Sequence, residues 1–90
     1  MTIHDRAIAL IEKDGIDNVI RKSEIGSTRW QTIKYKKARV SGEEIEALCK
    51  IYPQYAYWLT TGQIIPTAGQ VSPEYEELAR LEPQKSGTHD

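Results

Sequence analysis

The sequence predicts an all-helical domain of five short helices, followed by a short C-terminal helix and a tail. Apolar residues recur three and four positions apart, proline and glycine divide the chain into short segments, and no segment has the alternating pattern typical of a strand. Ninety residues suffice for one domain with a modest core. We expect residues 1–63 to form this domain, and residues 64–90 to hold a linker, a helix over 72–82 and a flexible tail.

The first two helices are indicated by their caps. Thr2 and Asp5 have the spacing of a capping box, which predicts a helix over 3–14 that ends at Gly15. Apolar residues follow at helical spacing within this range. Asp17 is the expected cap of a short second helix, because an aspartate side chain accepts hydrogen bonds from the free N–H groups of a first turn.

A tight turn is expected between the second helix and the third. The second helix ends near Ser23, and the third begins at Gly26 or Ser27 and continues to about Lys36. Such a turn needs a residue with a left-handed backbone, which glycine adopts freely and glutamate adopts poorly. We therefore expect Gly26, in place of Glu24, to absorb the strain of this turn.

The remaining helices also begin at recognisable residues. Ser41 and Glu44 form a second capping box, and the helix that they open cannot continue through Pro53. Pro53 suits the first turn of a fifth helix, which Gly62 ends. A sixth helix opens at Pro73 and carries an apolar stripe of three residues, Tyr75, Leu78 and Leu81.

Composition limits the classes of function. The one cysteine, Cys49, cannot form an internal disulfide, and the two histidines lie at opposite ends of the chain, so we expect neither a metal site nor a cofactor. The short length and the apolar neighbours of Cys49 argue against an enzyme with a nucleophilic thiol. No apolar run approaches the roughly 18 residues of a membrane span, so we expect a cytoplasmic protein.

Positive charge is concentrated in one segment of the chain. Residues 21–39 hold seven basic residues and one acidic residue (+6), whereas the rest of the chain holds five basic and twelve acidic residues (−7). This polarity is expected of a protein that meets a polyanion with one face. The alternative is a solvated helix face with unpaired lysines.

The third predicted helix lies inside the basic segment and has two different faces. Trp30 and Ile33 share an apolar face, and their spacing favours a place in the core over stacking on nucleic acid. The opposite face is polar and uncharged; it consists of Thr28, Gln31, Thr32 and Tyr35. Hydroxyls and amides can read base edges in the major groove of DNA, and a glutamine can pair with adenine. Lysine and arginine bind phosphates without reading sequence.

The order of these parts resembles the phage repressor and Cro-like helix-turn-helix proteins, the XRE family. The resemblance covers about residues 3–62 and runs without a gap from Val19 to Gly62. Its marks are the turn 24–26, the core pair Trp30 and Ile33, the basic loop 34–39, and the runs 41–48 and 57–62. The resemblance implies a five-helix lambda-repressor-like helix-turn-helix fold. It also implies a transcriptional regulator of bacterial or phage type, most simply a repressor, that binds double-stranded DNA in a sequence-specific manner.

The resemblance also assigns residues to two sets of DNA contacts. By position, the base-reading places of the family fall on Ser27, Thr28, Gln31 and Thr32. Its phosphate-contacting places fall near Tyr35, Lys36, Lys37 and Arg39, and the flanking cations Arg29 and Lys34 join this second set. We therefore expect the neutral residues to carry specificity and the cations to supply affinity.

One recognition helix reads only a few base pairs, so we expect a homodimer on a pseudo-palindromic operator with half-sites about 34 Å apart. Either the fifth helix or the stripe on the sixth helix would form its interface.

Two alternative functions stay open. One is an antitoxin-type DNA-binding autorepressor, whose acidic C-terminal segment binds a toxin. The other is a protein-interaction module that keeps the scaffold but has lost DNA binding.

Overall fold

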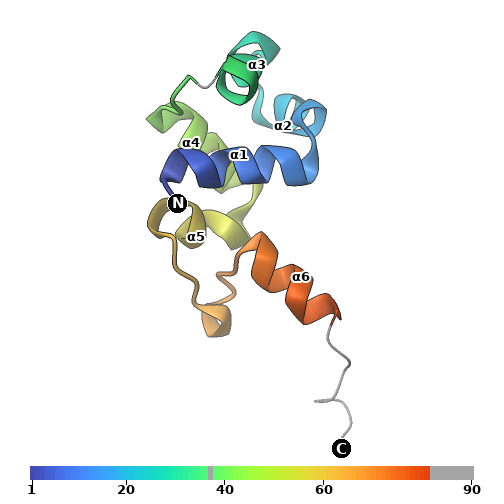
Figure 1. Ribbon diagram of the computed structural model, residues 1–90, viewed down its shortest axis with the longest axis vertical. Helices are drawn as coiled ribbons and strands as arrows, with labels where there is room; N and C mark the ends of the chain where they lie inside the picture. Colours follow the sequence, from blue (N-terminus) through green and yellow to red (C-terminus); the bar gives the residue numbers. More distant parts are fainter. Residues whose placement is uncertain (37, 82–90) are drawn as a thin grey trace, which may run out of the picture.

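The computed structural model describes residues 1–36 and 38–81. The secondary-structure elements of these residues are all helices (Figure 1). The helices are α1 (Ile3–Asp14), α2 (Ile16–Ser23), α3 (Ser27–Lys36), α4 (Gly42–Ile51), the 3-10 helix η1 (Pro53–Tyr55), α5 (Ala56–Thr61), the 3-10 helix η2 (Pro66–Ala68) and α6 (Pro73–Leu81). The predicted all-helical class is confirmed. The phosphate contact expected of Lys37 and the tail expected over 82–90 lie outside the described residues.

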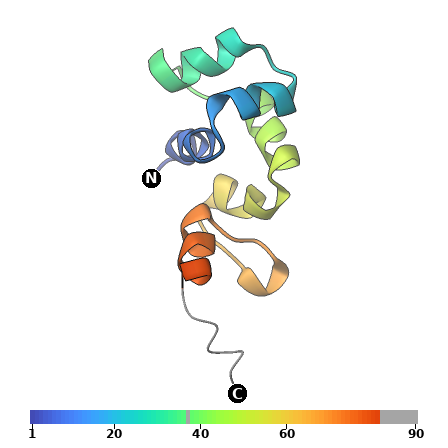
Figure 2. The same ribbon diagram turned by 90° about the vertical axis from the view of Figure 1, so that its right-hand side faces the viewer.

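The core lies between the first five α-helices. α1 contacts α2, α3 and α5, and α4 contacts α2 and α5, so the helices enclose a single apolar cluster. The buried members are Ala7, Leu10, Ile11, Val19, Trp30, Ile33, Leu48, Tyr52, Tyr55 and Leu59. Turned by 90°, the chain shows α3 above α2 at one end, with α4 leading down to α5 (Figure 2). Only one side of α3 is therefore used in packing.

The start of α1 follows the prediction, whereas the start of α2 does not. The Asp5 N–H donates to Thr2 Oγ1 at 3.1 Å and the Thr2 N–H donates to Asp5 Oδ2 at 3.0 Å, which confirms the capping box. Gly15, with φ of 92°, ends α1 and also precedes α2, which starts at Ile16. The prediction of Asp17 as a cap is wrong, because the turn at Gly15 is so short that Asp17 falls inside the first turn of α2.

The turn between α2 and α3 also differs from the prediction. Glu24 has φ of 63° and ψ of 15°, in the left-handed region, and Gly26 does not have a positive φ. Side-chain hydrogen bonds offset the strain: Ser23 Oγ accepts from the Ile25 N–H at 3.2 Å and from Trp30 Nε1 at 2.8 Å. The expectation that Gly26 absorbs the turn is therefore wrong, although α3 begins at Ser27 as expected.

Replacing Glu24 with glycine is expected to stabilise the fold by about 0.5–1 kcal/mol, because glycine adopts the left-handed backbone without a Cβ clash. Chemical denaturation of the two proteins measures this difference. Gly26→Ala is the matched control: an added Cβ there meets no atom within 4 Å, and we expect little change in stability. A Glu24→Gly variant less stable than the wild type would contradict this account of the turn.

The second half of the domain is joined to the first by a contact between residues that are far apart in the sequence. The Ser41 and Glu44 capping box is present, and α4 ends at Ile51, before Pro53 opens η1 and then α5. The predicted fifth helix is thus a 3-10 turn continued by an α-helix. Arg6, buried in α1, donates from Nε to the Leu59 carbonyl at 2.9 Å, and so satisfies a carbonyl at the end of α5.

The segment before α6 folds back on the domain. Gln70 Oε1 accepts from the Tyr57 N–H at 2.9 Å, and the Val71 N–H donates to the Gln54 carbonyl at 2.9 Å. α6 then projects beyond the other helices (Figure 1), held by a hydrogen bond from the Tyr55 hydroxyl to the Glu76 carboxylate. No residue of α6 is buried. No described helix is long and apolar enough to cross a membrane.

Candidate nucleic-acid interface

α3 is anchored by its apolar side and leaves its polar side uncovered. Trp30 and Ile33 have no exposed surface, which confirms the core face expected from their spacing. Ser27, Thr28 and Gln31 are exposed on the helix, and Tyr35 is 64% exposed. A helix fixed on one side and open on the other can enter a groove without rearrangement of the domain.

One of the four candidate base-reading residues differs from the other three. Thr32 is half-buried, and its hydroxyl donates to the Thr28 carbonyl at 2.7 Å. Its hydroxyl proton is therefore used inside the helix, and the oxygen is left as an acceptor. Ser27, Thr28 and Gln31 are exposed, so their polar groups are open to solvent.

Three cations at the end of α3 and in the following loop have no acidic partner within the described part of the chain. Among the described residues, no carboxylate oxygen lies within 4.0 Å of a side-chain nitrogen of Lys34, Lys36 or Arg39. Lys36 and Arg39 are exposed, and Lys34 Nζ lies 5.2 Å from the centroid of the Tyr35 ring. These groups supply positive charge beside the polar face of α3.

The cations of α2 are engaged with the domain. Lys22 Nζ lies 2.9 Å from Asp14 Oδ2 and 5.6 Å from the centroid of the Tyr52 ring. Arg21 donates to Asn18 Oδ1 at 2.6 Å. Among residues 1–36 and 38–81, the basic segment therefore divides into a part on α2 whose cations are engaged with the domain and a part around the C-terminal end of α3 without acidic partners.

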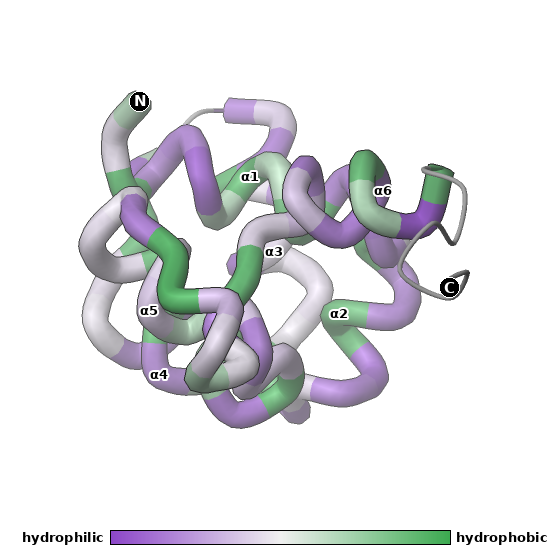
Figure 3. Tube along the Cα trace, turned by 90° about the horizontal axis from the view of Figure 1, so that it is seen from below, coloured by the Kyte–Doolittle hydropathy of each residue, from purple (hydrophilic) through white to green (hydrophobic). Residues whose placement is uncertain are grey.

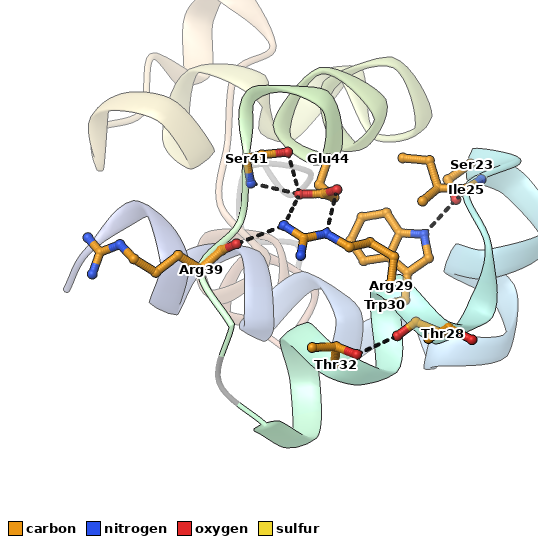
Figure 4. A network of polar contacts seen from close by, with 9 residues as sticks. All are labelled: Ser23, Ile25, Thr28, Arg29, Trp30, Thr32, Arg39, Ser41 and Glu44. Atoms are coloured by element: carbon orange, nitrogen blue, oxygen red, sulfur yellow. Dashed lines mark hydrogen bonds and ion pairs between the residues drawn. The ribbon is translucent and has the colours of Figure 1, made fainter.

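Arg29 is also engaged, and its partner is a buried carboxylate (Figure 4). Its Nε donates to Glu44 Oε2 at 2.9 Å, and its Nη2 donates to Glu44 Oε1 at 3.1 Å and to the Arg39 carbonyl at 2.9 Å. Glu44 Oε1 also accepts from the backbone N–H and the hydroxyl of Ser41, each at 2.7 Å. The sequence predicted a phosphate contact for Arg29, whereas the structure places its guanidinium between α3, the following loop and α4.

These hydrogen bonds keep Glu44 ionised in spite of its burial. Only 3% of its side chain is exposed, and desolvation disfavours the charged form. The hydrogen bonds from Arg29, followed by those from Ser41, outweigh the desolvation and lower the pKa of Glu44 to about 2. The same pairing raises the pKa of Arg29 above its ordinary value. The pair is therefore fully charged at neutral pH.

A second polar contact also fixes the first turns of α3. Trp30 Nε1 donates to Ser23 Oγ, which in turn lies in the turn that leads into α3 (Figure 4). This bond satisfies the one polar atom of a fully buried tryptophan side chain. α3 is thus held by the apolar core, by Ser23 near its start and by Glu44 alongside.

The thiol of Cys49 lies apart from this surface, on α4. The residue is half-buried, and burial raises the pKa of the thiol. The protonated form is therefore favoured, which disfavours the thiolate that a nucleophile requires.

Two contacts of this site, and one burial elsewhere in the domain, were not predicted from the sequence. The pairing of Arg29 with Glu44 joins residues 15 positions apart, and Glu44 was interpreted only as part of a capping box. The bond from Trp30 to Ser23 and the burial of Arg6 were also missed. A basic residue inside a basic segment carries no local signal that it faces a buried acid.

Comparison with known proteins shows a close relative among the solved structures. No family model matches the chain, and no curated protein matches it. Among solved structures, the chain is 48% identical to Pf6r from the filamentous phage Pf6 of Pseudomonas aeruginosa PA01, with a TM-score of 0.83 over 89% of this chain and 95% of Pf6r. The chain belongs to the Pf6r family. The phage source of Pf6r agrees with the phage proteins that the sequence resembles. About half of the aligned positions differ from Pf6r, so the roles of the α3 residues are argued from this chain alone.

Proposed function

We propose that the chain is a phage-type regulator of transcription, most simply a repressor, that binds double-stranded DNA in a sequence-specific manner. α2 and α3 would act as a helix-turn-helix, with α3 in the major groove. The observation that carries this proposal is the rigidly backed α3, whose neutral polar face is open and is bordered by cations without an acidic partner among the described residues. Membership of a phage protein family supports it.

The contacts divide into two kinds. Ser27, Thr28, Gln31 and Thr32 would read base edges, because their hydroxyl and amide groups match the donor and acceptor pattern of the major groove. Lys34, Tyr35, Lys36, Lys37 and Arg39 would contact phosphates and fix the register of α3. Neither role requires a cofactor or a catalytic group, so we propose a binding protein rather than an enzyme.

Selection of bound duplexes from a random pool, at two salt concentrations, tests the proposed function. Enrichment of a pseudo-palindromic sequence is the expected result. A folded chain without measurable affinity for duplex DNA at low salt would contradict it and would favour the protein-interaction module. Binding to DNA that strengthens only with an added toxin partner would favour the antitoxin type.

Replacing Gln31 with alanine is expected to weaken binding to the selected operator by about 1–3 kcal/mol and to relax one base position. The reason is the loss of a side chain that pairs with a base edge. Binding curves on the operator and on single-base variants of it measure both effects. Lys36→Ala is the contrasting variant: it should weaken binding to all sequences alike and lower the salt slope by about one. An equal loss on every sequence for Gln31→Ala would contradict the base-reading role.

We propose that the apolar stripe of α6 packs against the same stripe in a second copy of the chain. Tyr75, Leu78 and Leu81 are 39%, 57% and 66% exposed, and in Figure 3 α6 lies at the edge of the molecule with hydrophobic positions among hydrophilic ones. Acidic residues occupy the first turn of α6 and Arg80 its last turn. Antiparallel pairing of two α6 helices would therefore join opposite charges beside an apolar seam. α5 is less suited, because Leu59 is buried and Trp58 packs on the core.

A further inference from the structure

We propose that Glu44 is a positioning residue that raises the specificity of DNA binding by holding Arg29 away from the phosphate backbone. This inference rests on the proposed function. It concerns a residue that contacts no DNA itself, and it gives Arg29 a role different from that of the other cations around α3.

The position of Arg29 on α3 is suited to a phosphate contact. It lies on the same side of the helix as Thr32 and Lys36, three and seven positions later. Its guanidinium donates to the carbonyl of Arg39, in the loop that carries the proposed phosphate contacts. The side chain is 38% exposed, so a phosphate could approach the guanidinium if its present partner were removed.

The contact with Glu44 occupies the guanidinium. Two nitrogens of Arg29 meet the two carboxylate oxygens of Glu44, a bidentate geometry that is stronger than a single ion pair. The carboxylate is nearly free of solvent, so salt screens this pair weakly. Moving Arg29 to a phosphate would leave a buried carboxylate without its main partner, which one exposed phosphate contact does not offset.

The consequence for binding follows from the separate roles of cations and neutral groups. Each cation that neutralises a phosphate strengthens binding to every sequence and adds to the salt dependence. Specificity depends on the ratio between the operator and all other sequences. By pairing with Arg29, Glu44 removes one sequence-blind contact from beside the base-reading face, and it keeps α3 in register with α4 and the loop.

Four proteins test this inference: the wild type, Glu44→Gln, Arg29→Gln and the double variant. Glutamine keeps the shape of Glu44 and can still accept from Ser41, but it carries no charge. On random duplex DNA, Glu44→Gln should bind more tightly than the wild type and should steepen the slope of log affinity against log salt by about 0.9, the value for one added phosphate contact. Arg29→Gln and the double variant should keep the wild-type slope.

The comparison separates the inference from the proposed function. A wild type that binds no duplex overturns both. If the wild type binds and Glu44→Gln leaves the slope on random DNA unchanged, only the role of Glu44 is overturned. If Arg29→Gln alone lowers the slope by about 0.9, Arg29 already contacts a phosphate and the inference is also overturned. The measurement on Arg29→Gln does not depend on whether Glu44→Gln folds. Circular dichroism melting of all four proteins verifies that each is folded.

Discussion

Acidification is expected to remove roughly 3 kcal/mol from the free energy of unfolding through Glu44 alone, between about pH 5 and about pH 2. The pKa of Glu44 is about 2 in the folded chain, against an ordinary value of 4.5. Because the folded pKa is the lower of the two, the contribution is fully present above the unfolded pKa. It is lost as the pH falls through the folded pKa, where the protonated carboxyl no longer pairs with Arg29.

Urea unfolding at a series of pH values measures this loss, and Glu44→Gln is the matched control. The variant has no carboxyl group to protonate at this position, so its stability should depend less steeply on pH over the same range. Asp5 and Asp14, whose pKa values are also lowered, remain in both proteins and cancel in the comparison. Equal losses of stability in the two proteins would show that Glu44 is not the source.

Local signals in the sequence predicted most of the helices. The capping boxes of Thr2 with Asp5 and of Ser41 with Glu44 depend on residues three positions apart, and both are present. The prediction for the turn after α2 was wrong because contacts with a neighbouring helix decide the conformation of this turn. The backbone preference of Glu24 is a local property, but it is overridden by the bonds that Ser23 makes to the turn and to Trp30 in the next helix.

The candidate site was only partly accessible from the sequence. Helical periodicity placed Trp30 and Ile33 in the core, and so placed the polar residues of α3 on the open side. Charge counting, in contrast, treats all cations of the segment as equal. The structure separates them, because Lys22 and Arg29 meet acids while Lys36 meets none among the residues that the structure describes. Such pairings join different helices and depend on packing that no local pattern encodes.

Replacing Leu78 with glutamate is expected to dissociate the proposed dimer and to weaken operator binding by about 100-fold or more. Leu78 is the middle residue of the α6 stripe, and a charge there would lie in an apolar seam beside the acidic residues of both helices. Two linked half-sites bind far more tightly than one, so loss of the link should cost more than loss of a single base contact. Analytical ultracentrifugation and operator binding measure the two effects.

Ile65→Glu is the matched control, because it places the same charge on another exposed apolar residue outside α6. We expect this control to remain dimeric and to bind the operator as the wild type does. Leu78→Glu should also keep its affinity for a single half-site, since α6 and α3 lie toward opposite ends of the molecule (Figure 1). If Leu78→Glu lost half-site binding as well, the substitution would have disturbed the domain. If it stayed dimeric, the interface would lie elsewhere, and the spacing of the two α3 helices would have to be set by another surface.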